Sequence, residues 1–191
     1  MNPRLPTSAF LVALATAFSL RGDQALCATS PPVIQSDLGL SVLQVGPLLS
    51  VNRWIKLRTN AFAHRLAARH APAYLLPGAL LLGAVTTGLY VMSSAFAVLL
   101  LARMLWGLAW SFIRHVSVGA VTHSVPAHDA RRVVEFYNEV SRAASLAGLP
   151  GGALRVDGVG YHATMLRLMG CSLPGVPLAF NAFGGPLRPF V

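Results

Sequence analysis

The sequence predicts an all-α fold: an integral membrane helical bundle of about six transmembrane helices, forming one membrane domain over residues 1–191. The composition supports this fold because 54% of the 191 residues are hydrophobic and only 11% are charged, whereas soluble domains carry about 25% charged residues. Residues 71–102 also contain no Asp, Glu, Lys or Arg. A third observation is that basic residues lie on both sides of this uncharged run.

The first expected span covers residues 8–29 and ends before Pro31-Pro32, because proline removes a backbone donor and clashes with the preceding helical turn. A short polar start and the apolar residues 9–20 are also compatible with a secretory signal peptide followed by an exported soluble protein. The uncharged run further along the chain speaks against that alternative.

The second expected span covers residues 42–63 and is only weakly apolar. Arg53, Lys56 and Asn60 are spaced i, i+3 and i+7, so they share one helix face. Such a face can be hidden in a bundle or in a water-filled cavity. The alternative is an amphipathic helix that lies in the membrane interface.

The uncharged run is longer than the roughly 20 residues that one crossing needs. A small polar stretch at residues 92–94 (Met-Ser-Ser) predicts a turn there, between a third span at 74–92 and a fourth at 96–121. The basic residues flanking this hairpin then lie on the same side. The positive-inside rule therefore places the loops 64–70 and 122–132 in the cytoplasm, for a protein of the cytoplasmic (inner) membrane.

A fifth span is expected at 133–154, and a turn at 155–160 separates it from a sixth span at 161–180. Small residues on one face of the fifth span let helix backbones approach closely in lipid, and Pro150 should bend it. The sixth span is interrupted by Arg167, Pro174 and Pro177.

The segment between the second and third spans reads NAFAHRLAAR. It resembles the loop motif G-x-L-A-D-R-x-G-R-R of the major facilitator superfamily (MFS), a family of membrane transporters, through Ala63, Arg65 and Arg69. Asn60 stands at the first glycine of the motif and His64 at its acidic residue. The resemblance implies a gating role for this loop, with the usual acid replaced.

Two further stretches are similar to MFS motifs. In the fourth span, Arg103 and Gly107 match the pattern R-x-x-Q-G, with Trp106 at the glutamine position. The fifth span resembles the G-P-x-x-G-G pattern of exporters in altered spacing, which implies helix packing by its small residues and proline. With Gly107, the residues that carry this expectation are Gly148, Pro150, Gly151 and Gly152.

The resemblance covers about Phe10 to Leu168 and implies the N-terminal half of an MFS transporter. The family has two halves with the substrate between them near the membrane midplane. The chain is therefore expected to be a half transporter that pairs with a second half or as a homodimer, a truncated gene product, or an incomplete record.

Charged residues inside membrane spans are costly, so they usually face a cavity, form pairs or serve an ion pathway. We expect such a pathway here, and Asp23 or Arg103 is expected to line the central cavity. The candidates are Arg21, Asp23, Arg53, Lys56, Arg103 and Arg114. The excess of basic over acidic residues favours an anionic small solute.

Other functional classes lack their signatures. The pI near 11 suits nucleic-acid binding, yet the chain has no Lys/Arg-rich run with interleaved aromatics. No catalytic motif occurs, and neither the two cysteines nor the scattered histidines have metal-ligand spacing. We therefore expect no enzyme, cofactor or metal site. The alternative to transport is a non-transporting interaction or assembly protein of the membrane, or an inactive transporter remnant.

Overall fold

The computed structural model describes residues 6–28 and 38–183, and for residues 21–28 and 148–159 it describes the backbone alone. All regular secondary structure in these residues is α-helical, as the sequence predicts. The helices are α1 (Thr7–Ala28), α3 (Val42–Arg69), α4 (Pro72–Met92), α5 (Phe96–His123), α6 (Ala130–Val159), α7 (Tyr161–Ser172) and α8 (Gly175–Phe183).

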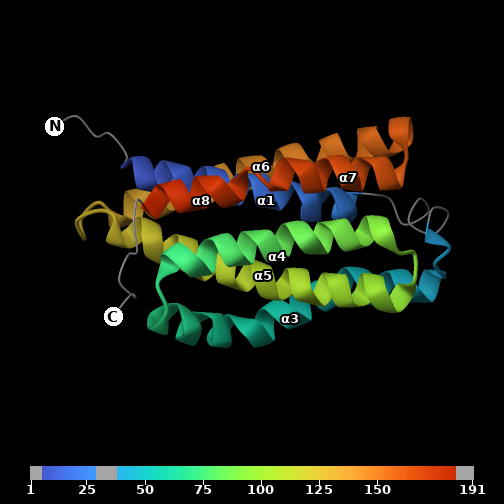
Figure 1. Cartoon of the computed structure of the whole chain (residues 1–191), viewed down its shortest axis with the longest axis horizontal. Coiled ribbons are helices and arrows are strands. Elements are labelled where there is room, and N and C mark those ends of the chain that lie inside the picture. The colour runs from blue at the N-terminus through green and yellow to red at the C-terminus, as the bar shows by residue number, and fades with distance from the viewer. Residues whose placement is uncertain (1–5, 29–37, 184–191) are drawn as a thin grey trace.

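The helices lie side by side along the longest axis of the molecule (Figure 1). In this view α1, α6, α7 and α8 form one group, and α3, α4 and α5 form the other. Helix α1 packs most extensively against α6, and both α3 and α4 pack against α5. Because α5 also contacts α1 and α6, it joins the two groups.

Three helical segments are long and apolar enough to cross a membrane: Pro72–Met92, Phe96–His123 and Tyr161–Phe183, the last comprising α7 and α8. They indicate a membrane location. Helix α1 contributes a shorter apolar stretch, Thr7–Leu20, to the described residues. Of the six expected spans, three therefore meet the criteria of length and composition within the described part of the chain.

Helix α4 shows how an uncharged helix accommodates its polar side chains. The hydroxyls of Thr86 and Thr87 are buried, and both donate to the carbonyl oxygen of Gly83, at 2.8 and 3.0 Å. Each hydroxyl is thus satisfied within its own helix, as an apolar environment requires. Leu81 and Val85 are about half exposed on the outer face, where lipid would cover them.

Two connections differ from the sequence expectations. Residues 64–69 are the last turns of α3 rather than a basic loop, so the turn is confined to His70 and Ala71 before α4 begins. The expected turn at 155–160 is reduced to Gly160, whose φ of 82° lies in the left-handed region that favours glycine. By contrast, the sixth segment is interrupted at Leu173-Pro174, between α7 and α8, as expected for Pro174, whereas Arg167 and Pro177 lie within helices.

The core consists of two clusters of buried side chains. One cluster joins α1, α3, α4, α5, α6 and α8 and includes Leu76, Ile113 and Tyr137. The other joins α3, α4, α5 and α7 and includes Leu48 and Met165. Since both clusters contain residues of α5, the position of that helix is fixed by packing along its length, which suits a helix that carries a functional face.

Candidate functional site

One face of α5 carries the residues around which the candidate site is built. Trp106, Trp110, Arg114 and Val118 follow one another at intervals of four positions, so they form a row along the helix. Trp110 and Arg114 line two neighbouring hollows, one towards α3 and the other towards α1 and α6. The two hollows meet at these side chains, and together we call them the groove.

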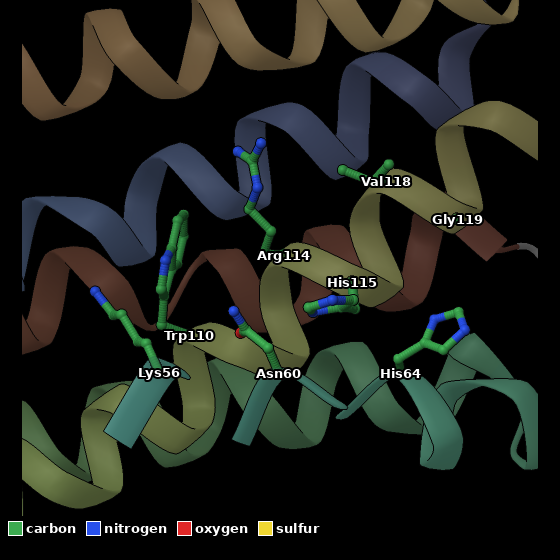
Figure 2. Close-up of a pocket in the computed structure, with 8 residues that line it drawn as sticks. All are labelled: Lys56, Asn60, His64, Trp110, Arg114, His115, Val118 and Gly119. Carbon is green, nitrogen blue, oxygen red and sulfur yellow. The ribbon is translucent and has the colours of Figure 1, made fainter. Parts of the chain in front are cut away.

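The first hollow has a volume of about 590 Å³ and lies between α3 and α5. Figure 2 shows the side chains of both helices around it. They are Lys56, Asn60, His64, Trp110, Arg114, His115, Val118 and Gly119. Because Lys56, Asn60 and His64 are four positions apart, helical geometry places all three on the same face of α3.

A stacked pair of indoles forms the aromatic wall of this hollow. The rings of Trp106 and Trp110 lie 5.9 Å apart between centroids, with planes inclined by 21°. Trp106 is 1% exposed, and Trp110 is only partly buried. The Lys56 ammonium lies 5.0 Å from the Trp106 ring centroid and 5.4 Å from that of Trp110, within the range of cation–π attraction.

The second hollow has a volume of about 480 Å³, and its lining comes from α1, α5 and α6. Arg114 Nη1 donates a hydrogen bond of 3.2 Å to Oδ1 of Asn138 on α6. This bond holds the guanidinium of the exposed Arg114 to α6. Arg142, which also lines this hollow, pairs with Glu139 at 3.0 Å.

Two histidines lie at the end of the first hollow. The rings of His64 on α3 and His115 on α5 are 6.2 Å apart between centroids. His115 Nδ1 is 2.8 Å from the carbonyl oxygen of Ser111, so this nitrogen is the protonated one in the neutral ring. The Ser111 hydroxyl in turn lies 2.8 Å from that of Thr59, which ties α5 to α3 beside the site.

The groove is basic. Its lining contains Lys56, Arg114 and Arg142 together with the two histidines, and among the described residues that line the two hollows none is acidic. Glu139 lines neither hollow but forms an ion pair with Arg142, in which both side chains are mostly exposed. The arrangement can therefore attract an anion and offer an aromatic surface beside it.

The structure brings together four of the residues singled out from the sequence: Lys56, Asn60, His64 and Arg114. Arg53 is exposed and lines neither hollow. Among the other positions of the expected loop motif, Ala63 is buried, while Arg65 and Arg69 are exposed on the last turns of α3.

Arg103 lies in the interior rather than in the groove. It is 1% exposed, and its Nε donates to the carbonyl oxygen of Leu48 at 3.4 Å, which links α5 to α3. Gly107, one turn further along, marks a close approach of the same two helices: a Cβ there would lie 2.8 Å from Asn52 Oδ1. Both residues therefore contribute to the packing of α5 against α3.

Several expected residues lie where side chains are outside the described part of the structure, and their roles stay predictions. For Arg21 and Asp23 the structure gives only the backbone of α1. The same holds for α6 at the expected packing residues Gly148, Pro150, Gly151 and Gly152.

The groove residues that were not among the candidates from the sequence include Trp110, His115 and Asn138. The interval of four from Trp106 through Trp110 to Arg114 could have identified Trp110 as part of a polar-aromatic face. Asn138 carried no such signal, because its place depends on how α6 packs beside α5.

No protein family model matches the chain. A chloramphenicol resistance protein from Streptomyces lividans is 26% identical to it over 170 residues, which cover 89% of this chain and 43% of the relative. The chain thus spans less than half the length of this curated protein, and the similarity is distant.

Proposed function

We propose that this chain is the helical bundle of an MFS-type secondary transporter, and that it moves a small organic solute across the membrane. The observation that carries the proposal is the groove, in which Lys56, Trp110 and Arg114 converge from two helices. The three apolar segments support it, because polar groups that converge inside a membrane bundle typically mark a solute or ion path.

The distant relative supports the same class of function. It is named as a chloramphenicol resistance protein, and resistance through removal of the drug from the cell would require export of a small aromatic molecule. We therefore propose efflux as the direction of transport, with the groove as the solute's contact surface.

In the transport cycle expected for this family, two bundles rock about a site near the midplane of the membrane. The groove would be the part of such a site that this chain contributes. A second bundle would close it, supplied either by another copy of the chain or by a separate half. The loops after α3 and α5 would face the cytoplasm, because basic residues flank both.

Transport by the purified chain is the direct test. The protein would be reconstituted into liposomes, and the movement of radiolabelled chloramphenicol and radiolabelled benzoate would be followed with and without a proton gradient. We expect protein-dependent, saturable movement of at least one of them. The Arg114→Gln variant should reduce it at least tenfold, whereas Arg58→Gln should not, because the exposed Arg58 lines neither hollow.

The alternative is a membrane protein that binds partners without moving solute. If protein-containing and empty liposomes behaved alike with both solutes, while the protein was folded and correctly inserted, transport by this chain would be contradicted. An unrelated membrane complex that co-purified with it at a fixed stoichiometry would then favour the partner role.

A further inference from the structure

We propose that the outer face of α3 binds the headgroup of an anionic phospholipid, with Arg65 and Arg69 on its phosphate and apolar side chains beside its acyl chains. This surface lies away from the groove, so the inference does not depend on transport by this chain. It follows from the position of α3 in the bundle, from the residues on its outer face and from the distribution of acidic residues along the sequence.

Helix α3 presents one face to the bundle and leaves the opposite face outside. Among the described helices it has extensive contacts with α5 alone, and Figure 1 shows the second half of α3 at the outer edge of its group. Arg65 follows Lys56 by nine positions, which is about two and a half helical turns, so the two side chains leave α3 on opposite sides. A second bundle that closed the groove over Lys56 would therefore not cover Arg65.

Arg65 and Arg69 provide the charge on the outer face. They are four positions apart and both are exposed. Helical geometry places them one turn apart, about 6 Å along the axis, so two guanidinium groups can reach the same phosphate. Among the described residues neither guanidinium has an ion-pair or hydrogen-bond partner. A guanidinium binds a phosphate with two parallel hydrogen bonds, so these two side chains suit a phosphate ligand.

Acidic residues are absent from the whole helical group to which α3 belongs. Residues 38–128, which include all of α3, α4 and α5, contain neither Asp nor Glu. On α6, Glu135 and Glu139 pair with arginines of their own helix, at 2.8 and 3.0 Å. Arg65 and Arg69 therefore have no acidic neighbour within their own group, and an anion from the membrane can compensate their charge.

Apolar side chains continue the outer face towards the middle of α3, and they favour a lipid over a soluble anion. Trp54 and Leu57 are mostly exposed, and Phe62 is about half exposed. Leu57 and Phe62 precede Arg65 by eight and three positions, or about 12 and 5 Å along the helix axis. They would lie beside the acyl chains of a lipid whose phosphate is held at Arg65. A nucleic acid or an acidic peptide would leave these side chains uncovered.

The end of α3 is a suitable place for such a lipid. The helix ends at Arg69, and the turn to α4 follows directly. The positive-inside rule places this end at the cytoplasmic leaflet, whose anionic lipids attract basic residues near the membrane surface. Helix α3 is not among the three described segments that are apolar enough to cross a membrane. A lipid that compensates its arginines would therefore help to hold it in the bilayer beside α4 and α5.

Two lipids with the same acyl chains test the headgroup preference. We suggest phosphatidylglycerol, which is anionic, and phosphatidylcholine, in which the choline ammonium offsets the attraction of the arginines for the phosphate. Binding of each lipid to the purified chain in detergent micelles would be measured by native mass spectrometry. We expect phosphatidylglycerol to bind at least about fivefold more tightly.

Matched variants then assign the preference to α3. Arg65→Gln and Arg69→Gln should each reduce phosphatidylglycerol affinity by about threefold or more and leave phosphatidylcholine affinity within about twofold. Arg131→Gln is the control, because Arg131 is an exposed arginine at the same end of the bundle that is already paired with Glu135. It should leave both affinities within about twofold. Leu57→Ser should weaken both lipids alike, because it removes a contact with the acyl chains that they share.

Equal affinities of the wild-type chain for the two lipids would overturn the proposal, and this comparison does not depend on the folding of any variant. A loss in Arg131→Gln as large as that in Arg65→Gln would overturn it as well, because the preference would then come from the general charge of this end. Displacement of phosphatidylglycerol by glycerophosphoglycerol, the same headgroup without acyl chains, would show a site for soluble phosphates instead of a lipid. Selective lipid binding without transport in the liposome assay would contradict the proposed function alone.

Discussion

The ammonium of Lys56 on α3 lies 5.0 Å from the ring centroid of Trp106 on α5, a residue that is 1% exposed. A cation is thus held against one of the most deeply buried aromatic rings of the bundle. Through this contact, a side chain that lines the groove packs against the interior of the bundle. The position of the charge in the site therefore depends on the packing of Trp106, and this dependence can be tested.

Replacing the buried indole should destabilise the bundle. Trp106→Ala removes a large, fully buried side chain, and the cavity that remains should cost about 3–5 kcal/mol of unfolding free energy. We expect a lower apparent melting temperature in detergent, measured by circular dichroism.

Trp54→Ala is the matched control, since Trp54 on α3 is 66% exposed and little packing inside the protein is lost with it. Its melting temperature should stay within a few degrees of the wild type. Equal destabilisation by the two variants would show that the burial of Trp106 does not contribute to stability as the structure indicates.

The close approach of α3 and α5 at Gly107 should not tolerate even one added carbon. A Cβ there would meet Asn52 Oδ1 at 2.8 Å, Ile55 Cγ2 at 3.1 Å and the Asn52 carbonyl oxygen at 3.2 Å. Because one of these atoms belongs to the backbone, the helices themselves would have to separate. Gly107→Ala should therefore destabilise by about 1–3 kcal/mol, measured as a shift of the thermal or denaturant midpoint.

The control for this prediction is Gly78 on α4, where a Cβ would meet nothing within 4 Å. Gly78→Ala should be neutral or stabilising by up to about 1 kcal/mol, because alanine has the higher helix propensity. If both alanine variants were neutral, the close approach at Gly107 would not exist in the folded protein.

The sequence predicted much of the fold, since the uncharged run, the polar stretch at 92–94 and the positions of prolines are local signals. It misplaced the end of α3 because the charge of residues 64–69 was interpreted as a loop. Alanine, leucine and arginine are strong helix formers, and the chain offers no helix-stopping residue before Pro72. Charged residues near a membrane surface mark where the lipid-embedded part of a helix ends. They do not end the helix itself.

Lys56, Asn60, His64 and Arg114 were all candidates from the sequence, but only residues within one helix could be placed relative to one another. Lys56 and Asn60 were placed on a common face of α3 by their spacing alone. The partners of that face on α5, and Asn138 on α6, depend on the rotation of each helix about its axis, which the pattern of apolar residues fixes poorly in a membrane protein. The interior position of Arg103 likewise depends on its bond to Leu48, 55 residues away.

Asn138 should act as a positioning residue for Arg114. In Asn138→Ala the guanidinium loses its acceptor and has to be ordered by the ligand, at a cost of about 0.5–1.5 kcal/mol. The affinity of the purified chain for radiolabelled benzoate, measured by equilibrium binding, should therefore fall by roughly two- to tenfold.

Asn138→Asp distinguishes positioning from mere packing. The new carboxylate would pair with Arg114 and neutralise it, so this variant should weaken benzoate binding more than Asn138→Ala does and should affect the binding of neutral benzamide less. An aspartate variant that bound the anion as tightly as the wild type would show that Arg114 does not contact it.

The orientation of the bundle gives a further prediction. The turn after α3 and the connection between α5 and α6 lie at the same end of the α4–α5 hairpin, and Ser94 lies at the opposite end, between α4 and α5. Basic residues flank the first two connections and are absent from the third. The positive-inside rule then places Ala68 and Ala127 in the cytoplasm and Ser94 on the other side.

Single cysteines test this orientation, in a background in which Cys27 and Cys171 are replaced by serine. Ala68, Ala127 and Ser94 are all exposed, so a cysteine at each should be reachable by a membrane-impermeant maleimide. In intact cells we expect the reagent to label the Ser94→Cys variant alone. In inside-out vesicles we expect it to label Ala68→Cys and Ala127→Cys instead. Labelling of Ala68→Cys and Ala127→Cys from opposite sides of the membrane would mean that α4 and α5 do not form a membrane hairpin, and the groove could then not face a solute path.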